Sequence, residues 1–291
     1  MKTPLLIEQH FHGAYGVDFN KAGADDIIGL SYKLRKLGIG GFFPTLVTDS
    51  VQNINRQIAI IKEAAKSCPA ILGIHLEGIF INPAKKGIHN PEHFLELTVE
   101  NFQKIEDDFI KIVTLAPELD SGLIEYLKER KGKVQAGHST GWGCVDGATH
   151  TFNAMSGVTH RGTSAALSAL IHDEVYAEII GDGVHVSDDA LKLFFKAKPE
   201  DKVILISDAL PITYSDMKET VFADSKIYYD GDKATSADGT IAGSTKLLPE
   251  IIKILGKKGM FKPQYIENVY HYHGLDPIGE IEWDEDFNPR F

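Results

Sequence analysis

Histidines that could hold a metal ion occur first in a His-x-His pair. His10 and His12 lie in an apolar segment that begins at Leu5. Successive residues of a strand point to opposite sides, so two imidazoles spaced by two share one side and could bind one ion together. A lone His-x-His pair is a weak signal for a metal site, and the interpretation needs further ligands nearby.

A carboxylate ends another apolar segment. Glu77 follows Ile74, His75 and Leu76. Burying a carboxylate at such a position is costly unless a cation or hydrogen-bond donors accompany it. Glu77 is therefore a candidate metal ligand, and a salt bridge to Lys85 or Lys86 is the alternative.

Three further polar residues follow short apolar segments. His138 and His150 stand where neutral imidazoles often serve as ligands on a rigid scaffold. With Glu77 they provide two nitrogens and one carboxylate, the ligand set of a catalytic zinc-type site with a position open for water. Asp208 could take a proton from that water and return it to a leaving group, and a capping role is the alternative.

Apolar segments alternate with helical patterns, which predicts an α/β fold. We count eight apolar segments, which is the number of strands in a (β/α)8 TIM-like barrel. They cover residues 5–13, 38–47, 70–78, 109–117, 133–139, 147–155, 176–186 and 202–210. Predicted helices cover residues 23–37, 50–66, 92–106, 119–130, 164–173, 188–198 and 245–259. Because the carboxyl ends of barrel strands converge on one face, His10 and Asp208 can meet despite their separation in sequence.

The predicted barrel has one short connection. Only residues 140–146 separate the fifth and sixth segments, and a parallel connection normally needs about a dozen residues or more. The crossover helix after strand five is therefore expected to be missing or minimal. We interpret residues 1–291 as a single domain, with 211–240 as an insertion or small hairpin over the barrel mouth and 262–291 as a polar C-terminal tail.

Composition excludes several classes of protein. The 291 residues are 43% apolar and 24% charged, which is too apolar for a disordered chain. A net charge of -11 disfavours nucleic acid and anionic membranes as partners. The two cysteines, Cys68 and Cys144, form no CxxC motif, and Glu8 interrupts the first apolar stretch, so we expect a cytoplasmic protein without a signal peptide.

Over about residues 5–250 the chain resembles the N-acetylglucosamine-6-phosphate deacetylases of the amidohydrolase superfamily. The similarity rests on the order of several motifs along the predicted strands, of which the second is highly specific. They are residues 9–13, 73–89, 114–118, 137–139, 149–156, 182–186 and 207–210.

The resemblance implies roles for particular residues. Glu77, His138 and His150 would bind the main divalent metal, with zinc favoured over iron or manganese, and Asp208 would be the catalytic acid and base. Members with a His-x-His pair hold a second ion. In this chain His10 and His12 would bind it, and Glu77 would bridge the two ions.

The resemblance also implies substrate contacts. His89 would contact the sugar or the amide carbonyl, and His185 would also contact the substrate. Asn153 and the Ala154 backbone would reach the phosphate of the sugar phosphate. Arg161 matches an arginine that crosses the dimer interface to that phosphate, which implies a homodimer.

The chain departs from the family pattern in three ways. Relatives have about fifty residues before the first barrel strand, which form a small β-sandwich with a C-terminal stretch, and we expect this sandwich to be absent. Relatives also have a longer segment between His138 and His150, and a proline where this chain has Ile79, which we expect to be a minor backbone change.

Two alternative functions remain open at this point. The first is another amidohydrolase activity, such as cyclic-amide hydrolysis, although no lysine occupies a strand end where it could bridge two metals. The second is a non-catalytic protein that binds a sugar phosphate on a shortened barrel.

Overall fold

Eight parallel strands form the central sheet of the computed structural model, which describes residues 1–290. Each neighbouring pair is parallel, and each strand lies within one of the predicted segments. In sheet order the strands are β2 (Leu6–Phe11), β5 (Ile39–Val47), β6 (Ile74–Glu77), β7 (Ile110–Leu115), β8 (Lys133–Ala136), β9 (Gly147–Ala148), β10 (Tyr176–Ile180) and β11 (Val203–Ile206).

The first and last strands approach each other and nearly close the sheet into a barrel. The Asp208 N–H donates to the His10 carbonyl at 2.9 Å, and the His12 N–H donates to the Ala209 carbonyl at 2.8 Å. These bonds lie at the carboxyl ends of β2 and β11. The predicted barrel is confirmed, and the seam itself brings His10, His12 and Asp208 together.

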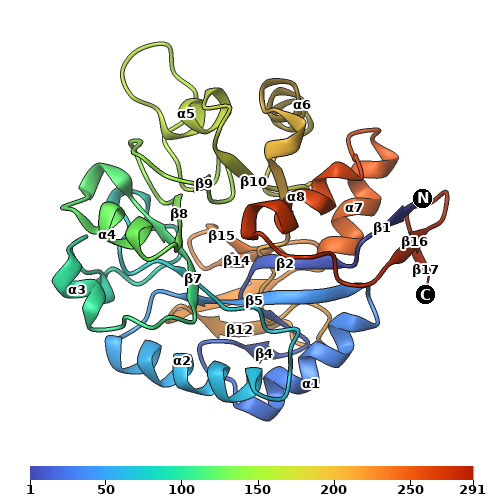
Figure 1. Cartoon of the computed structure of the whole chain (residues 1–291), viewed down its shortest axis with the longest axis horizontal. Helices are drawn as coiled ribbons and strands as arrows, with labels where there is room; N and C mark the ends of the chain where they lie inside the picture. Colours follow the sequence, from blue (N-terminus) through green and yellow to red (C-terminus); the bar gives the residue numbers. More distant parts are fainter. Residues whose placement is uncertain (291) are drawn as a thin grey trace.

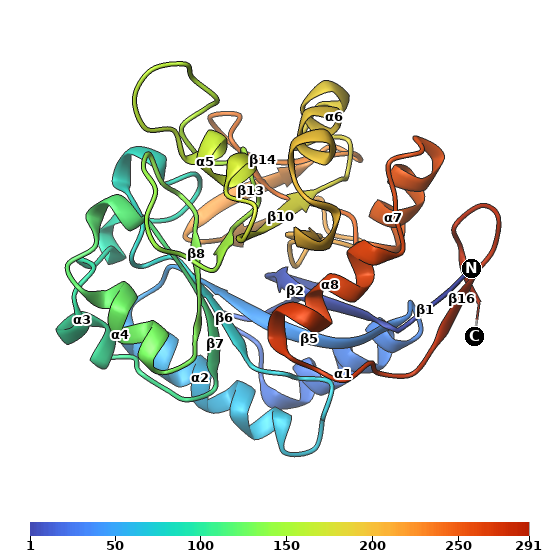
Figure 2. The same ribbon diagram turned by 45° about the horizontal axis from the view of Figure 1, so that its top comes forward.

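Helices cover the outside of this barrel (Figures 1 and 2). They are α1 (Ala24–Arg35), α2 (Val51–Ala65), α3 (Val99–Gln103), α4 (Leu123–Glu129), α5 (Ala165–Ile171), α6 (Asp188–Ala197) and α7 (Leu248–Lys257). Each overlaps a predicted helix, although only 99–103 of the predicted 92–106 is α-helical. The start of α2 shows the local cause, because the Ser50 hydroxyl accepts the Asn53 N–H at 3.2 Å.

The connection from β8 to β9 contains no helix in the described structure, as the sequence predicted. The Glu118 carboxylate holds this loop instead. It accepts the Thr140 N–H at 2.6 Å and the Ser139 hydroxyl at 2.7 Å. The turn that carries His138 is thus fixed by side-chain hydrogen bonds where a crossover helix is lacking.

The interpretation of 262–291 as a polar tail was wrong for its first part. Residues 264–273 form a helix, α8 (Gln264–His273), which lies across the amino-terminal end of the barrel. The Asn268 amide donates to the Val203 carbonyl at 2.8 Å, and the Tyr270 hydroxyl donates to the Leu5 carbonyl. Tyr265, Ile266, Val269 and Tyr270 are buried at helical spacing, a pattern that the many polar neighbours obscured.

Small sheets complete the fold. The predicted insertion forms a four-stranded antiparallel sheet of β12 (Glu219–Phe222), β13 (Ser225–Tyr229), β14 (Ala234–Ser236) and β15 (Ile241–Gly243). Near the two ends of the chain, β1 (Lys2–Thr3), β16 (Ile281–Trp283) and β17 (Pro289–Arg290) form another sheet (Figure 1). A short hairpin joins β3 (Gly13–Ala14) to β4 (Val17–Asp18). Across residues 1–290, every helix is too short or too polar to span a membrane.

Candidate active site

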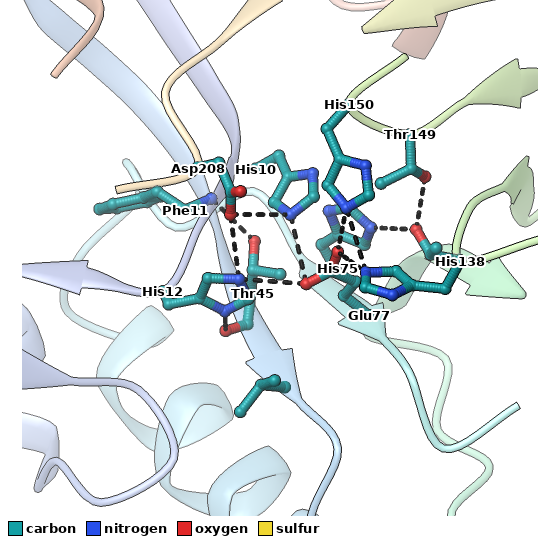
Figure 3. A network of polar contacts seen from close by, with 12 residues as sticks. His10, Phe11, His12, Thr45, His75, Glu77, His138, Thr149, His150 and Asp208 are labelled. Atoms are coloured by element: carbon teal, nitrogen blue, oxygen red, sulfur yellow. Dashed lines mark hydrogen bonds and ion pairs between the residues drawn. The ribbon is translucent and has the colours of Figure 1, made fainter. Parts of the chain in front are cut away.

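Glu77, the last residue of β6, lies at the centre of a buried cluster of histidines (Figure 3). Its Oε1 lies 2.8 Å from Nε2 of His150 and 3.2 Å from Nε2 of His138. Its Oε2 lies 3.1 Å from Nε2 of His12 and 3.4 Å from Nε2 of His10. The two oxygens of one carboxylate therefore serve two separate pairs of histidines.

Asp208 faces the pair of histidines from β2. Its Oδ1 lies 3.2 Å from Nε2 of His12 and 3.5 Å from Nε2 of His10. One group of potential ligands thus consists of His10, His12, Glu77 and Asp208, and Glu77 joins it to a second group with His138 and His150. Lys85 does not pair with Glu77, because its ammonium donates to the Met155 carbonyl at 2.9 Å.

Backbone carbonyls set the orientation of two of these rings. Nδ1 of His12 lies 3.2 Å from the Thr45 carbonyl, and Nδ1 of His138 lies 2.8 Å from the Lys85 carbonyl. A carbonyl can only accept, so Nδ1 carries the proton in both rings. In the neutral imidazole this leaves the lone pair on Nε2, which points toward Glu77 and is free to bind a cation.

A buried carboxylate orients His10 in the same way. Nδ1 of His10 lies 2.9 Å from Oε2 of Glu178, a residue of β10. Glu178 also accepts the Gln9 amide at 2.6 Å and the His150 backbone N–H at 3.2 Å. Glu178 therefore contacts residues that belong to both halves of the cluster.

The charges in the cluster reinforce one another. Burial opposes ionisation of Glu77, but the charge of the nearby His10, followed by the hydrogen bonds of His12 and His138, holds the pKa of Glu77 well below its usual range. Burial also lowers the pKa of His12, yet its bonds to Asp208 and Glu77 outweigh this and raise the pKa to about 9. Without a cation, the carboxylates therefore retain a proton on this histidine.

The donors present fit a divalent metal. Four Nε2 atoms and two carboxylates converge, which is a nitrogen and oxygen set suited to zinc and similar ions. Within residues 1–290, Nε2 of His10 has no well-aligned hydrogen bond although it is buried. Such an atom is expected to have a partner, and a cation between Glu77 and Asp208 would provide one.

The backbone is strained where three of these residues leave their strands. His138, His150 and Asp208 each follow a strand end by two residues and have positive φ values of 49°, 28° and 53°. This conformation is unfavourable for side chains other than glycine and often marks functional sites. The predicted strands 133–139, 147–155 and 202–210 were too long for this reason.

A cavity of about 460 Å³ opens beside the cluster, and ligand pockets commonly have such volumes. Four of the predicted substrate-binding residues line it: His89, Asn153, Ala154 and His185. His185 is held by Asp182, whose carboxylate lies 2.8 Å from its Nδ1. Burial lowers the pKa of His185, but Asp182 outweighs that effect and raises it, which favours a positive charge in the cavity.

Arg161 lies outside this cavity. It is exposed in the loop that precedes α5. The insertion contributes lining residues that the sequence analysis did not single out, among them Phe222 of β12 and Ile241 of β15. Only their place in an insertion over the mouth could have indicated them.

Comparisons with known proteins agree with this geometry. Over 263 residues the chain is 35% identical to N-acetylglucosamine-6-phosphate deacetylase of Bacillus subtilis. This match covers 83% of this chain and 66% of the relative. It is 30% identical to N-acetylgalactosamine-6-phosphate deacetylase of Escherichia coli O157:H7, with 83% and 68% covered. The chain belongs to the N-acetylglucosamine-6-phosphate deacetylase family. The resemblance found in the sequence is confirmed, and the chain spans about two thirds of the length of these curated relatives.

The fold is also that of the deacetylase family. The crystal structure of N-acetylglucosamine-6-phosphate deacetylase from Thermotoga maritima superimposes with a TM-score of 0.91 at 25% identity, covering 99% of this chain and 85% of that one. The enzyme from Pasteurella multocida gives a TM-score of 0.90, with 99% and 83% covered. No protein-family model matches the chain.

Ile79, which the sequence analysis expected to be a minor backbone change, has a larger effect on the backbone. Ile79 has a φ of 62°, and its N–H donates to the Thr48 hydroxyl at 2.8 Å. Proline fixes φ near −65° and has no N–H, so it could take neither role. A proline could therefore not occupy position 79 in this backbone, and Ile79 in its place is not a minor change.

The sequence analysis missed the residues that hold several of the site histidines in place. Glu178, Thr45 and Thr48 contact His10, His12 and His89 and are buried. The sequence could have indicated Glu178, because a carboxylate within the apolar segment 176–180 needs a hydrogen-bonding or charged partner when it is buried. The Thr45 contact is made by its carbonyl, which no side-chain pattern reveals.

Proposed function

We propose that the chain is a metal-dependent amide hydrolase that removes the acetyl group from N-acetylglucosamine 6-phosphate or a closely related N-acetylhexosamine 6-phosphate. Water adds its oxygen to the acyl carbon, the carbon–nitrogen bond breaks, and acetate and the amino sugar phosphate are released. The observation that carries this proposal is the convergence of four histidines and Glu77, which could hold a metal, with Asp208 beside them at the edge of one cavity.

The reaction requires activated water, a polarised carbonyl and a proton for the departing amine. Glu77 and the histidines would hold a divalent cation, and such a cation would supply the first two requirements, by lowering the pKa of water and attracting the carbonyl oxygen. Asp208 lies at the boundary of the cluster and the cavity, where its carboxylate can take the proton of the attacking water and pass it to the amine nitrogen. His89 faces the same cavity as a hydrogen-bond donor to the substrate.

The phosphate of the substrate is bound separately. His185, whose pKa is raised by its contact with Asp182, and the backbone around Asn153 and Ala154 supply donors inside the cavity. Arg161 would contact the phosphate of a substrate bound to the neighbouring subunit. The enzyme would then be a homodimer with shared active sites. This placement is supported by the exposure of Arg161 outside its own cavity.

We further propose that the whole chain acts as one hydrolase domain with zinc as its metal, bound as one or two ions. The four imidazoles and the Glu77 carboxylate suit zinc, and iron or manganese can also bind such nitrogen and oxygen ligands. Cytoplasmic amino sugar metabolism agrees with two free cysteines, one of them exposed.

The test is acetate release from a panel of N-acetylated hexosamine 6-phosphates, with elemental analysis of the same preparation. We expect acetate in amounts equal to the free amine, and loss of activity after chelation that added metal reverses. Binding of the sugar phosphate with no acetate released by the metal-loaded protein would contradict the proposal and indicate a non-catalytic binding protein.

A further inference from the structure

A buried threonine contacts His89 on the side away from the cavity. Nδ1 of His89 lies 2.7 Å from Oγ1 of Thr48, the residue that follows β5. The same Oγ1 accepts the Ile79 N–H at 2.8 Å. Both side chains are almost fully buried.

The available protons decide which atom donates in this pair. The Ile79 N–H can only donate, so it occupies one lone pair of the Thr48 oxygen. The remaining partner of that oxygen within residues 1–290 is Nδ1 of His89. A buried hydroxyl proton needs an acceptor, so the Thr48 O–H donates to Nδ1. In the neutral ring the proton of His89 must then be on Nε2.

This arrangement is the reverse of that found in the ligand histidines. Nδ1 of His12 and Nδ1 of His138 face carbonyl groups, which leaves a lone pair on Nε2 for a cation. His89 instead presents an N–H from Nε2. That atom lies 3.8 Å from Oε2 of Glu77, too far for a hydrogen bond. The Nε2–H is therefore free to donate to a molecule in the cavity.

The backbone at Gly78 packs tightly against this contact. Gly78 has a φ of 109°, and a Cβ atom at this position would lie 2.1 Å from Oγ1 of Thr48 and 2.7 Å from Nδ1 of His89. The threonine and the histidine thus pack directly on the glycine Cα. The turn at Gly78 and Ile79 therefore brings the Ile79 N–H, the Thr48 hydroxyl and the His89 ring into direct contact.

We propose that Thr48 is a positioning residue that fixes His89 as the Nε2–H tautomer, so that His89 donates to the oxygen of the substrate amide as negative charge develops there. This inference rests on the proposed function for its role in catalysis. The tautomer itself follows from contacts within the protein and can be measured without substrate.

The experiment compares Thr48→Val, which keeps the shape and removes the hydroxyl, with Thr48→Ser, which keeps the hydroxyl. Long-range ¹H–¹⁵N spectra of the metal-loaded protein report which ring nitrogen is protonated, and loss of a signal in His89→Gln assigns it. We expect Nε2–H in the wild type and in Thr48→Ser, and an appreciable Nδ1–H population in Thr48→Val.

Activity gives the second measurement. Removal of a donor that stabilises a developing oxyanion costs roughly 10²–10³ in kcat, so misorienting one should cost about tenfold or more, with KM changed much less. Thr48→Ser should restore most of kcat. Thr213→Val is the matched control, because Thr213 is also buried and its hydroxyl donates to the Ser244 carbonyl away from the cavity.

Three results would overturn the inference: Nδ1–H in the wild type, an unchanged tautomer in Thr48→Val with normal kcat, or an unchanged tautomer with reduced kcat, which indicates a structural role only. If the wild type releases no acetate, the proposed function fails. The ¹⁵N spectra still decide whether Thr48 sets the tautomer.

Discussion

Nδ1 of His10 lies 2.9 Å from the Glu178 carboxylate, at the base of the metal-binding cluster. Carboxylates in this position orient a ligating imidazole and make its other nitrogen more basic. Because Glu178 also accepts the His150 N–H, it holds one ligand from each half of the cluster.

We therefore predict that Glu178→Gln lowers metal affinity by about tenfold to a hundredfold without unfolding the barrel. Competition with a chromophoric chelator would measure this change. Glu174→Gln, at an exposed position near the start of the same strand, is the control and should bind metal as the wild type does. Equal affinities of the two variants would show that Glu178 does not support the site.

Asp208→Asn should reduce kcat by about 10²–10⁴ and leave the metal content largely intact. The amide keeps the shape of the side chain but cannot take a proton from water. Steady-state acetate release and elemental analysis of the same sample separate these effects. A variant with near-normal kcat would remove Asp208 from the proposed mechanism.

Metal affinity should rise with pH up to about 9. Without a cation, His12 has a pKa of about 9 despite its burial, because Asp208 and Glu77 hold its proton. A cation must displace that proton, so binding releases protons near neutral pH and weakens in acid. Titration calorimetry in buffers with different ionisation enthalpies would count the protons released. A count of zero at pH 7 would contradict this prediction.

Arg161→Ala should raise KM for the 6-phosphorylated substrate and leave the turnover of a non-phosphorylated analogue nearly unchanged. Arg161 is exposed outside its own cavity, so its proposed phosphate contact requires a neighbouring subunit. Sedimentation velocity would establish whether the wild type is a dimer. A fully active monomer would exclude the shared active site.

Lys198 gives a pH-dependent stability far from the metal cluster. Its ammonium is buried and donates to the carbonyls of Ala169 and His172, and burial lowers its pKa from 10.5 to about 8. Between these values the unfolded chain binds more protons than the folded one, so the free energy of unfolding should rise with pH, by about 3 kcal/mol at most.

Urea unfolding of Lys198→Met and of the wild type between pH 8 and 10.5 would test this effect. The difference in stability between the two proteins should change across this range, because only the wild type gains stability from loss of the Lys198 proton. Lys196→Met, at an exposed position in the last turn of α6 two residues before Lys198, should show no such change. Parallel curves for Lys198→Met and the wild type would refute the prediction.

The sequence by itself determined the local elements and the types of chemical group available. Apolar segments mark all eight barrel strands because strands buried on both faces must be apolar. The polar residues that interrupt or end those segments, from His10 to Asp208, stand out against that background. Motif order was sufficient to indicate the family. The helix α8 escaped because its buried face is made largely of tyrosines among polar residues.

Only the tertiary structure decided how those groups are used. Whether an imidazole offers a lone pair or an N–H depends on what its other nitrogen meets, and those partners come from distant segments. The Lys85 carbonyl makes His138 a candidate ligand, whereas the Thr48 hydroxyl makes His89 a donor. Closure of the barrel creates these contacts, and no periodicity in the chain encodes them.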